Sequence, residues 1–201
     1  TSLKGSLIIG KPNMSTKKAS SSNPRSVTSL PTANRKVLVL TNLGIDLVDP
    51  KDDIVYLGPW CFVPKARELS DKEYLEYHWN DRRKLERDAR EVGKLFEAVL
   101  EKLSGKFNKI HGLAYSDRFW RITIGPWLHT FLAVLFDRWE IIEQARNSPS
   151  IAAAMIAEPV GKAQVAENTT EFDQICATDW WNLILFSELL RERGTVFELD
   201  T

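Results

Sequence analysis

The chain has 201 residues, 43% of them hydrophobic and seven of them tryptophan, so it can bury the core of one full domain. Its formal net charge of zero argues against non-specific binding to nucleic acid or to an anionic membrane. The only cysteines, Cys61 and Cys176, form no CxxC pair, so two reduced, buried thiols are expected in place of a zinc site or a disulfide framework.

Residues 1–34 form a leader that differs from the rest of the chain. They are rich in Ser, Thr, Asn and Lys, lack a lasting apolar period, and precede the first carboxylate, Asp46. Such a segment cannot offset the entropy lost on ordering, so we expect it to be disordered and residues 35–201 to form the domain. A plain tail, or translated sequence upstream of a start at Met14, is the favoured interpretation, and an organelle transit peptide is the alternative.

The ordered part is expected to begin with two buried strands. Residues 37–40 and 54–57 are short apolar runs followed by turn residues. A helix then follows, because apolar residues from Leu85 to Leu103 recur every three or four positions. Asn80 or Asp81 can cap its start, and Gly105 is expected just past its end.

The second half of the chain is expected to be mainly helical. Pro126 suits the first turn of a buried helix over 127–146, and loops around a short helix over 151–158 come next. A last helix is expected from Asp179, as its N-cap, to Gly194. The best candidate for a membrane span, 127–136, is about half the length that a spanning helix needs. Strands followed by helices indicate a helix-rich α/β domain.

Several common catalytic motifs are absent from the sequence. It contains no GxxxxGK[ST], no GxGxxG after the first strand, no HExxH and no GxSxG. These absences disfavour a phosphate-binding loop, a standard dinucleotide site, a zinc protease and a serine hydrolase. Asp-x-Asp is also missing, so the usual metal clamp for a nucleotide-sugar diphosphate is not expected.

Aromatic and charged residues gather in a few stretches. In the stretch that begins at Ser116, Arg118 and Arg121 flank aromatic residues. These arginines suit a carboxylate or a phosphate, because a guanidinium binds either oxyanion in a fork, and tryptophan faces suit the C–H surface of a sugar. His78 can act as an acid or base or hold an anion, but a structural histidine is the favoured alternative. Asp137 serves equally well as a site residue or as a buried partner for neighbouring side chains. The candidate substrate-binding residues are His78, Trp79, Arg118, Trp120, Arg121, Trp127, Asp137, Arg138 and Asn182.

Six blocks, in this order, resemble a known family, the putative O-antigen transferases that include the retaining β-Kdo glycosyltransferases. The blocks are YLGPWC at 56–61, YHWNDR at 77–82, IHG at 110–112, RFWRITIGPWL at 118–128, FDRW at 136–139 and DWWN at 179–182. The likeness covers residues 36–193. Two departures are the lack of an acid directly after the first strand and Leu183 where the family usually has histidine.

The resemblance implies an enzyme that transfers Kdo, or a related nonulosonic acid, from a CMP-sugar to a surface glycan of the lipopolysaccharide O-antigen or capsule type. It implies a Rossmann-like N-terminal half of a GT-B-type fold, with no metal and no cofactor besides the CMP-sugar donor. It gives Arg118 and Arg121 the donor carboxylate as a partner, and Arg121→Ala is expected to weaken sugar or acceptor binding without unfolding the domain. No residue is assigned as the nucleophile that retention requires.

The same resemblance implies a C-terminal nucleotide-binding domain, or a partner chain, that supplies most contacts to CMP. A binding or scaffold domain without catalysis, derived from such an enzyme, is the alternative function. The expected partners are a sugar donor and a glycan acceptor, without nucleic acid and without a transmembrane segment. A cytoplasmic location is expected; attachment at the membrane periphery and organelle targeting through residues 1–34 are the alternatives.

Overall fold

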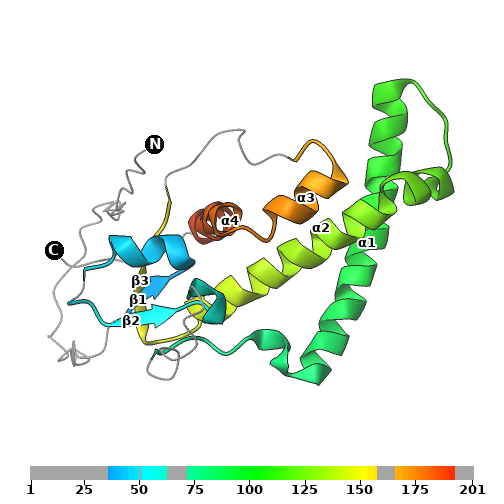
Figure 1. Ribbon diagram of the computed structural model, residues 1–201. Helices are drawn as coiled ribbons and strands as arrows, with labels where there is room; N and C mark the ends of the chain where they lie inside the picture. The colour runs from blue at the N-terminus through cyan, green and yellow to red at the C-terminus, as the bar shows by residue number, and fades with distance from the viewer. Residues whose placement is uncertain (1–35, 50, 63–71, 158–165, 193–201) are drawn as a thin grey trace, which may run out of the picture.

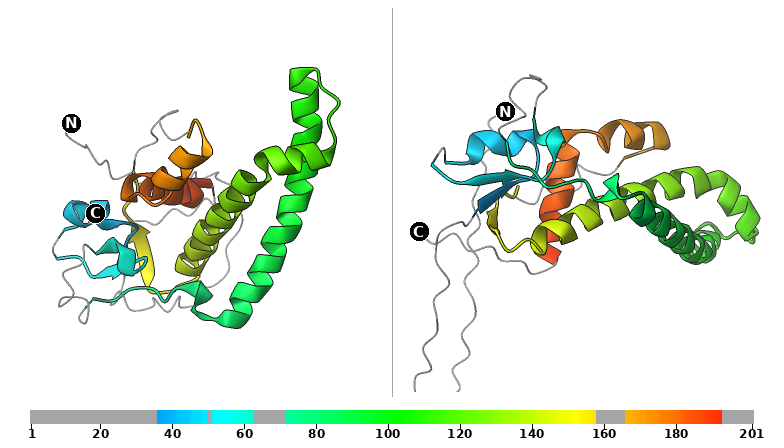
Figure 2. Two further views of the ribbon diagram at one scale, coloured as in Figure 1. Left: turned by 45° about the vertical axis from the view of Figure 1, so that its right-hand side comes forward. Right: turned by 90° about the horizontal axis from the view of Figure 1, so that it is seen from below.

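The computed structural model describes residues 36–49, 51–62, 72–157 and 166–192 (Figure 1). The predicted disordered leader and Gly194 lie outside these ranges. In the described part, a small sheet and two helices form one end of the molecule, and a long helical hairpin projects from it (Figures 1 and 2). This arrangement confirms a helix-rich α/β domain, whereas the Rossmann-like GT-B half stays a prediction.

The sheet has three parallel strands in the order β2-β1-β3. The central strand β1 (Lys36–Val39) pairs with β2 (Ile54–Tyr56) on one side and with β3 (Ile151–Ala154) on the other. The two predicted strands are therefore confirmed, each ending one residue earlier than expected. Both are almost fully buried, as is usual for apolar runs in parallel sheets.

The third strand contradicts the short helix expected over 151–158. Its sequence, Ile-Ala-Ala-Ala, favours a helix by intrinsic propensity. Pairing with β1 overrides that preference, and the strand alternates buried and half-buried side chains as a pleated strand does. Ile151 and Ala153 point into the core, where Ala153 is 2% exposed.

Helix α1 (Arg82–His111) is longer than the sequence pattern suggested. The expected N-cap, Asp81, accepts a hydrogen bond from the amide of Arg83 at 2.9 Å. The expected stop, Gly105, lies inside the helix, where it costs about 1 kcal/mol relative to alanine. The helix ends at Gly112 instead, whose φ of 64° is the left-handed conformation that glycine adopts without strain.

Helix α2 (Asp117–Arg146) starts ten residues before the position that Pro126 suggested. Ser116 is its N-cap, and Pro126 lies in the helix interior, contrary to the prediction. A proline there removes the hydrogen bond to the carbonyl of Ile122. Because Ile122 is 70% exposed, that carbonyl lies on the solvent side, where water can satisfy it.

Two apolar clusters hold the described part together. One joins α1 to α2 along the hairpin, through Val92, Phe96, Leu100, Leu128 and Leu132. The other surrounds the sheet and includes the last turns of α2 and helix α4 (Asp179–Glu192), through side chains such as Ile142 and Phe186. Helix α3 (Thr169–Ile175), in a stretch expected to be a loop, precedes α4. Helix α2 thus connects the hairpin with the sheet.

Helix α2 is less enclosed than the sequence suggested. Trp127–Arg146 was expected to be buried nearly all round, but many of its side chains are half-buried and His129 is exposed. By length and composition alone, α2 is apolar enough to cross a membrane, although its sheet-facing turns contribute to the core of the domain. The expectation that no segment reaches that length was therefore wrong, because the helix extends through Pro126.

Candidate functional site

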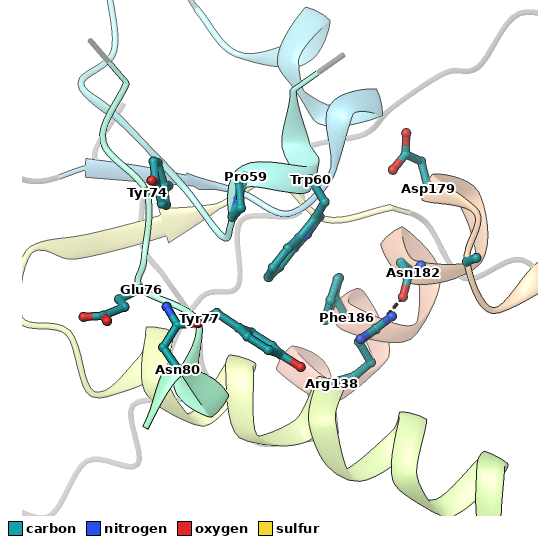
Figure 3. Close-up of a pocket in the computed structure, with 11 residues that line it drawn as sticks. Pro59, Trp60, Tyr74, Glu76, Tyr77, Asn80, Arg138, Asp179, Asn182 and Phe186 are labelled. Atoms are coloured by element: carbon teal, nitrogen blue, oxygen red, sulfur yellow. Dashed lines mark hydrogen bonds between the residues drawn. The ribbon is translucent and has the colours of Figure 1, made fainter. Parts of the chain in front are cut away.

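A pocket of about 750 Å³ opens beside the end of β2 (Figure 3). Its wall comes from the short 3₁₀ turn Pro59–Cys61, from residues 74–80, from α2 and from the start of α4. In sheets of parallel strands, ligands bind beyond the carboxyl ends of the strands, and this pocket lies beyond the carboxyl end of β2. Its volume is in the range that encloses a small organic ligand.

Two aromatic rings meet in the pocket. The indole of Trp60 projects into it and meets the ring of Tyr77 edge to face, with centroids 6.2 Å apart (Figure 3). Gly58 makes room for this indole, because a Cβ at that position would lie 2.3 Å from the Trp60 ring. Trp60 is 37% exposed, and Figure 3 places its indole in the pocket.

A guanidinium from α2 also lines the pocket, near the hydroxyl of Tyr77 (Figure 3). Arg138, on α2, donates from Nε to Oδ1 of Asn182 at 2.7 Å and from Nη1 to Asp137. Asn182 is held by two further bonds, because its amide donates to the carbonyls of Cys176 and Thr178. Among the described residues, no partner is recorded for Nη2 of Arg138, and 24% of the side chain is exposed. Arg138 is thus held firmly while one donor group stays available to a ligand.

Asp137 anchors this arrangement from behind the pocket. The carboxylate is 5% exposed and accepts hydrogen bonds from the hydroxyl of Tyr77 at 2.7 Å and from Nε2 of His78 at 2.9 Å. Burial, followed by the hydrogen bond to Asp137, raises the pKa of the Tyr77 hydroxyl, so this group stays a donor. Asp137 and His78 therefore position Tyr77 and Arg138 and do not line the pocket themselves.

A second polar cluster adjoins the first and could offer ligands to a metal. His78, Asp88 and Glu140 each have a ligand atom within 4.8 Å of the others. The ammonium group of Lys84 lies between the carboxylates, 2.5 Å from Asp88 and 2.5 Å from Glu140. Among the residues that the structure describes, Nδ1 of His78 has no hydrogen-bond partner, and it lies 3.9 Å from Asp88. A divalent cation would have to displace Lys84, whose charge already compensates these acids.

The nine site residues predicted from the sequence fall into two groups in the structure. His78, Asp137, Arg138 and Asn182 come together, and Trp79 adjoins them by donating from Nε1 to Asp88 at 2.9 Å. The remaining predicted residues lie elsewhere on the hairpin, and they are Arg118, Trp120, Arg121 and Trp127.

The arginines expected at the sugar carboxylate do not line this pocket. Arg121 forms a two-bond ion pair with Glu97 of α1, and Arg118 is exposed. Seventeen residues separate Arg121 from Arg138 along α2, about 25 Å at a rise of about 1.5 Å per residue. Trp120 donates to Asn108 within the hairpin core.

Trp127 lines a separate pocket of about 440 Å³ with Phe131, Phe172 and Trp181. Its ring stacks on that of Phe131, with centroids 5.2 Å apart. The sequence prediction thus grouped residues of one helix that point to different places.

Tyr77 and Asp179 were absent from the predicted site. Asp179 lines the pocket and was explained as a helix cap, but Thr178 caps α4 by accepting from the amide of Trp181 at 3.3 Å. That leaves the Asp179 carboxylate in the first turn of α4, next to Asn182 in the pocket. The signal for Tyr77 was its position directly before His78 in the YHWNDR block.

The cysteines differ in their surroundings. Cys61 is buried and donates from Sγ to the carbonyl of Val39 at 3.5 Å, whereas Cys176 is half-buried, which contradicts the expectation of two buried thiols. Burial raises the pKa of the Cys61 thiol to about 11. Neither thiol has the depressed pKa that a nucleophilic cysteine requires.

Comparison with known proteins identifies the family. The sequence pattern of a family described as LIC12162 family transferase matches residues 36–200, nearly everything after the leader. No curated protein matches the chain, and no solved structure does. The matched range contains the entire described fold and every residue of the pocket beside β2. The chain therefore belongs to the LIC12162 family of transferases.

Proposed function

We propose that this chain provides the sugar-binding domain of a glycosyltransferase that transfers Kdo, or a related nonulosonic acid, from a CMP-sugar to a surface glycan. The main observation in support of this proposal is that one pocket combines the guanidinium of Arg138 with the aromatic faces of Trp60 and Tyr77. Membership of a transferase family supports group transfer. The sugar class rests on the resemblance of the six sequence blocks together with this pocket.

A nonulosonic acid carries a carboxylate, which distinguishes it from neutral sugars. Arg138 suits such a group because its Nη2 donor has no recorded partner among the described residues. Charge-assisted hydrogen bonds of this kind are stronger than neutral ones. Asp137 and Asn182 hold the guanidinium before any ligand arrives, so little side-chain entropy is lost on binding. In this proposal, Arg138 takes the role first expected of Arg118 and Arg121.

The rest of a sugar presents C–H faces and hydroxyl groups. Trp60 offers an exposed apolar ring to such a face, and the hydroxyl of Tyr77 lies on the same side of the pocket as Arg138 (Figure 3). Asp179 and Asn80 line the pocket as acceptors or donors for hydroxyl groups. Contacts to CMP are proposed to come from a second domain or a partner chain.

The test is calorimetric titration of the chain with Kdo, with CMP and with a Kdo-containing glycan, each separately. Arg138→Lys keeps a cation beside Asp137 but removes the fork, so it is expected to weaken Kdo binding about tenfold. Arg121→Lys is the matched control on the same helix and is expected to leave binding unchanged. Thermal unfolding of both variants checks that the fold is retained.

Two results would overturn the proposal. One is equal weakening by Arg138→Lys and Arg121→Lys, which would place the sugar elsewhere. The other is the absence of binding to Kdo and to the glycan, which would favour the non-catalytic scaffold instead. Binding of Kdo without CMP is the expected outcome for a domain that holds the sugar and leaves the nucleotide to another part.

A further inference from the structure

Exposed apolar side chains are concentrated at the far end of the helical hairpin. In the described part of the chain, eight large apolar side chains are exposed. Trp60 and Tyr74 belong to the pocket beside β2, and Leu95 stands alone on α1. The other five lie within thirteen consecutive residues, and they are Ile110 at 71%, Leu113 at 38%, Tyr115 at 47%, Phe119 at 40% and Ile122 at 70%. We call residues 105–122 the hairpin tip.

The tip holds these side chains in a defined arrangement. Asn108 accepts hydrogen bonds from the backbone amide of Tyr115 at 3.1 Å and from Nε1 of Trp120 at 3.0 Å, and it donates to the Tyr115 carbonyl at 2.8 Å. Beneath it, Trp120 packs on Phe107 with ring centroids 5.2 Å apart. The turn that presents Leu113 and Tyr115 is therefore fixed from inside, and no element of the described chain covers its apolar side chains.

The charge of the tip is unlike that of the whole chain. Lys106, Lys109 and Arg118 are exposed and form no ion pair with any described residue, while Asp117 is the one acid between residues 105 and 122. Arg121 is neutralised by Glu97. The net charge of zero, which argued against binding to an anionic membrane, is an average over the whole chain, and the hairpin tip is locally basic.

Apolar and aromatic side chains among basic ones are characteristic of protein surfaces that dock on anionic lipid. The apolar groups enter the boundary between headgroups and acyl chains, and the basic groups are attracted by the lipid phosphates. Within the described part, the tip is also the end furthest from the sheet (Figures 1 and 2). The residues that line the pocket beside β2 lie outside the tip, so contact of the tip with a membrane leaves them uncovered. We propose that the hairpin tip docks the protein on the surface of an anionic lipid bilayer.

The test is co-sedimentation of the full chain with vesicles of phosphatidylcholine, and with vesicles that also contain phosphatidylglycerol. The double substitution Ile110→Ser and Ile122→Ser removes the two most exposed of the large apolar side chains and is expected to lower the binding constant at least about tenfold. Replacing Lys106, Lys109 and Arg118 by Gln is expected to lower it about fivefold for each charge. Leu95→Ser changes an exposed leucine outside the tip and is the matched control.

The proposal predicts that the wild type and Leu95→Ser bind the anionic vesicles, that added salt weakens this binding, and that both tip variants bind more weakly than Leu95→Ser by the factors given above. The basic leader is present in every variant, so its attraction to lipid is common to all of them. The proposal is overturned if the wild type does not bind the anionic vesicles, or if the isoleucine variant binds them as well as Leu95→Ser. Capture of a protein partner by the tip, without vesicle binding, would also overturn it. Matching thermal unfolding midpoints show that losses are not caused by unfolding.

Discussion

Asp137→Asn tests whether the buried carboxylate organises the pocket. The substitution keeps the size of the side chain but removes its charge and turns one oxygen into a donor. The wild-type carboxylate accepts from Tyr77, His78 and Arg138. In the variant, an amide turned toward Arg138 meets another donor, and one turned toward Tyr77 and His78 requires both of these groups to accept instead of donate; in either orientation the charge of Arg138 is uncompensated.

The magnitude follows from this geometry. Removing one partner of a buried ion pair costs about 3–5 kcal/mol, and the partial exposure of Arg138 places the expected loss near the lower end, about 3 kcal/mol. Tyr77→Phe removes one donor and leaves the charged pair intact, so it is expected to cost about 1.5 kcal/mol. The two substitutions therefore have a predicted order as well as predicted sizes.

The assay is urea unfolding followed by tryptophan fluorescence, which gives the free energy of unfolding of each variant. Glu97→Gln is the matched control, because it makes the same carboxylate-to-amide change in the exposed pair with Arg121. It is expected to change the stability far less than Asp137→Asn does. Equal effects of the two amide substitutions, or a larger cost for Tyr77→Phe than for Asp137→Asn, would refute the reasoning.

Two further predictions concern pH and thiol reactivity. Burial raises the pKa of Asp88, but hydrogen bonds from Lys84 and Trp79 lower it further, to below its ordinary 3.8, so this stabilisation is present above that pH and lost as the pH falls through the folded value. Burial lowers the pKa of Lys84, but its two carboxylate partners raise it above 10.5, so the stability that Lys84 contributes is lost only as the pH rises through this raised value. In Lys84→Met, the free energy of unfolding measured across the pH range should lack both the loss at low pH and the loss at high pH. Curves that match those of the wild type would contradict this. Iodoacetamide at neutral pH should modify Cys176 before Cys61, as mass spectrometry can show, because Cys61 is fully buried; equal rates would contradict the burial of Cys61.

The parts of the fold that the sequence predicted well are those set by local chemistry. The apolar runs gave β1 and β2, and Asp81 marked the start of α1. Glycine and proline were less informative, because both are tolerated inside long helices whose stability comes from tertiary packing. Gly105 and Pro126 thus lie within α1 and α2, where the apolar contacts of the hairpin outweigh their local cost.

The candidate site could be predicted only in part for a related reason. Asp137, Arg138 and Asn182 were chosen for their chemistry, and the structure brings them together. Arg121 has the same chemistry, but its position on α2 places it opposite Glu97 of α1. Which partner an arginine finds depends on how α1 and α2 cross, and the pattern of a single helix does not contain that information.

The most direct test of the central claim is where Kdo binds on the domain. Each tryptophan indole N–H gives a separate signal in a ¹⁵N-correlated NMR spectrum, and single Trp-to-Phe variants assign the signals. The account predicts that added Kdo shifts the indole signal of Trp60, in the pocket beside β2, and leaves those of Trp120 and Trp127 unchanged. Shifts confined to Trp120 or Trp127 would contradict it, since the sugar would then bind on the hairpin.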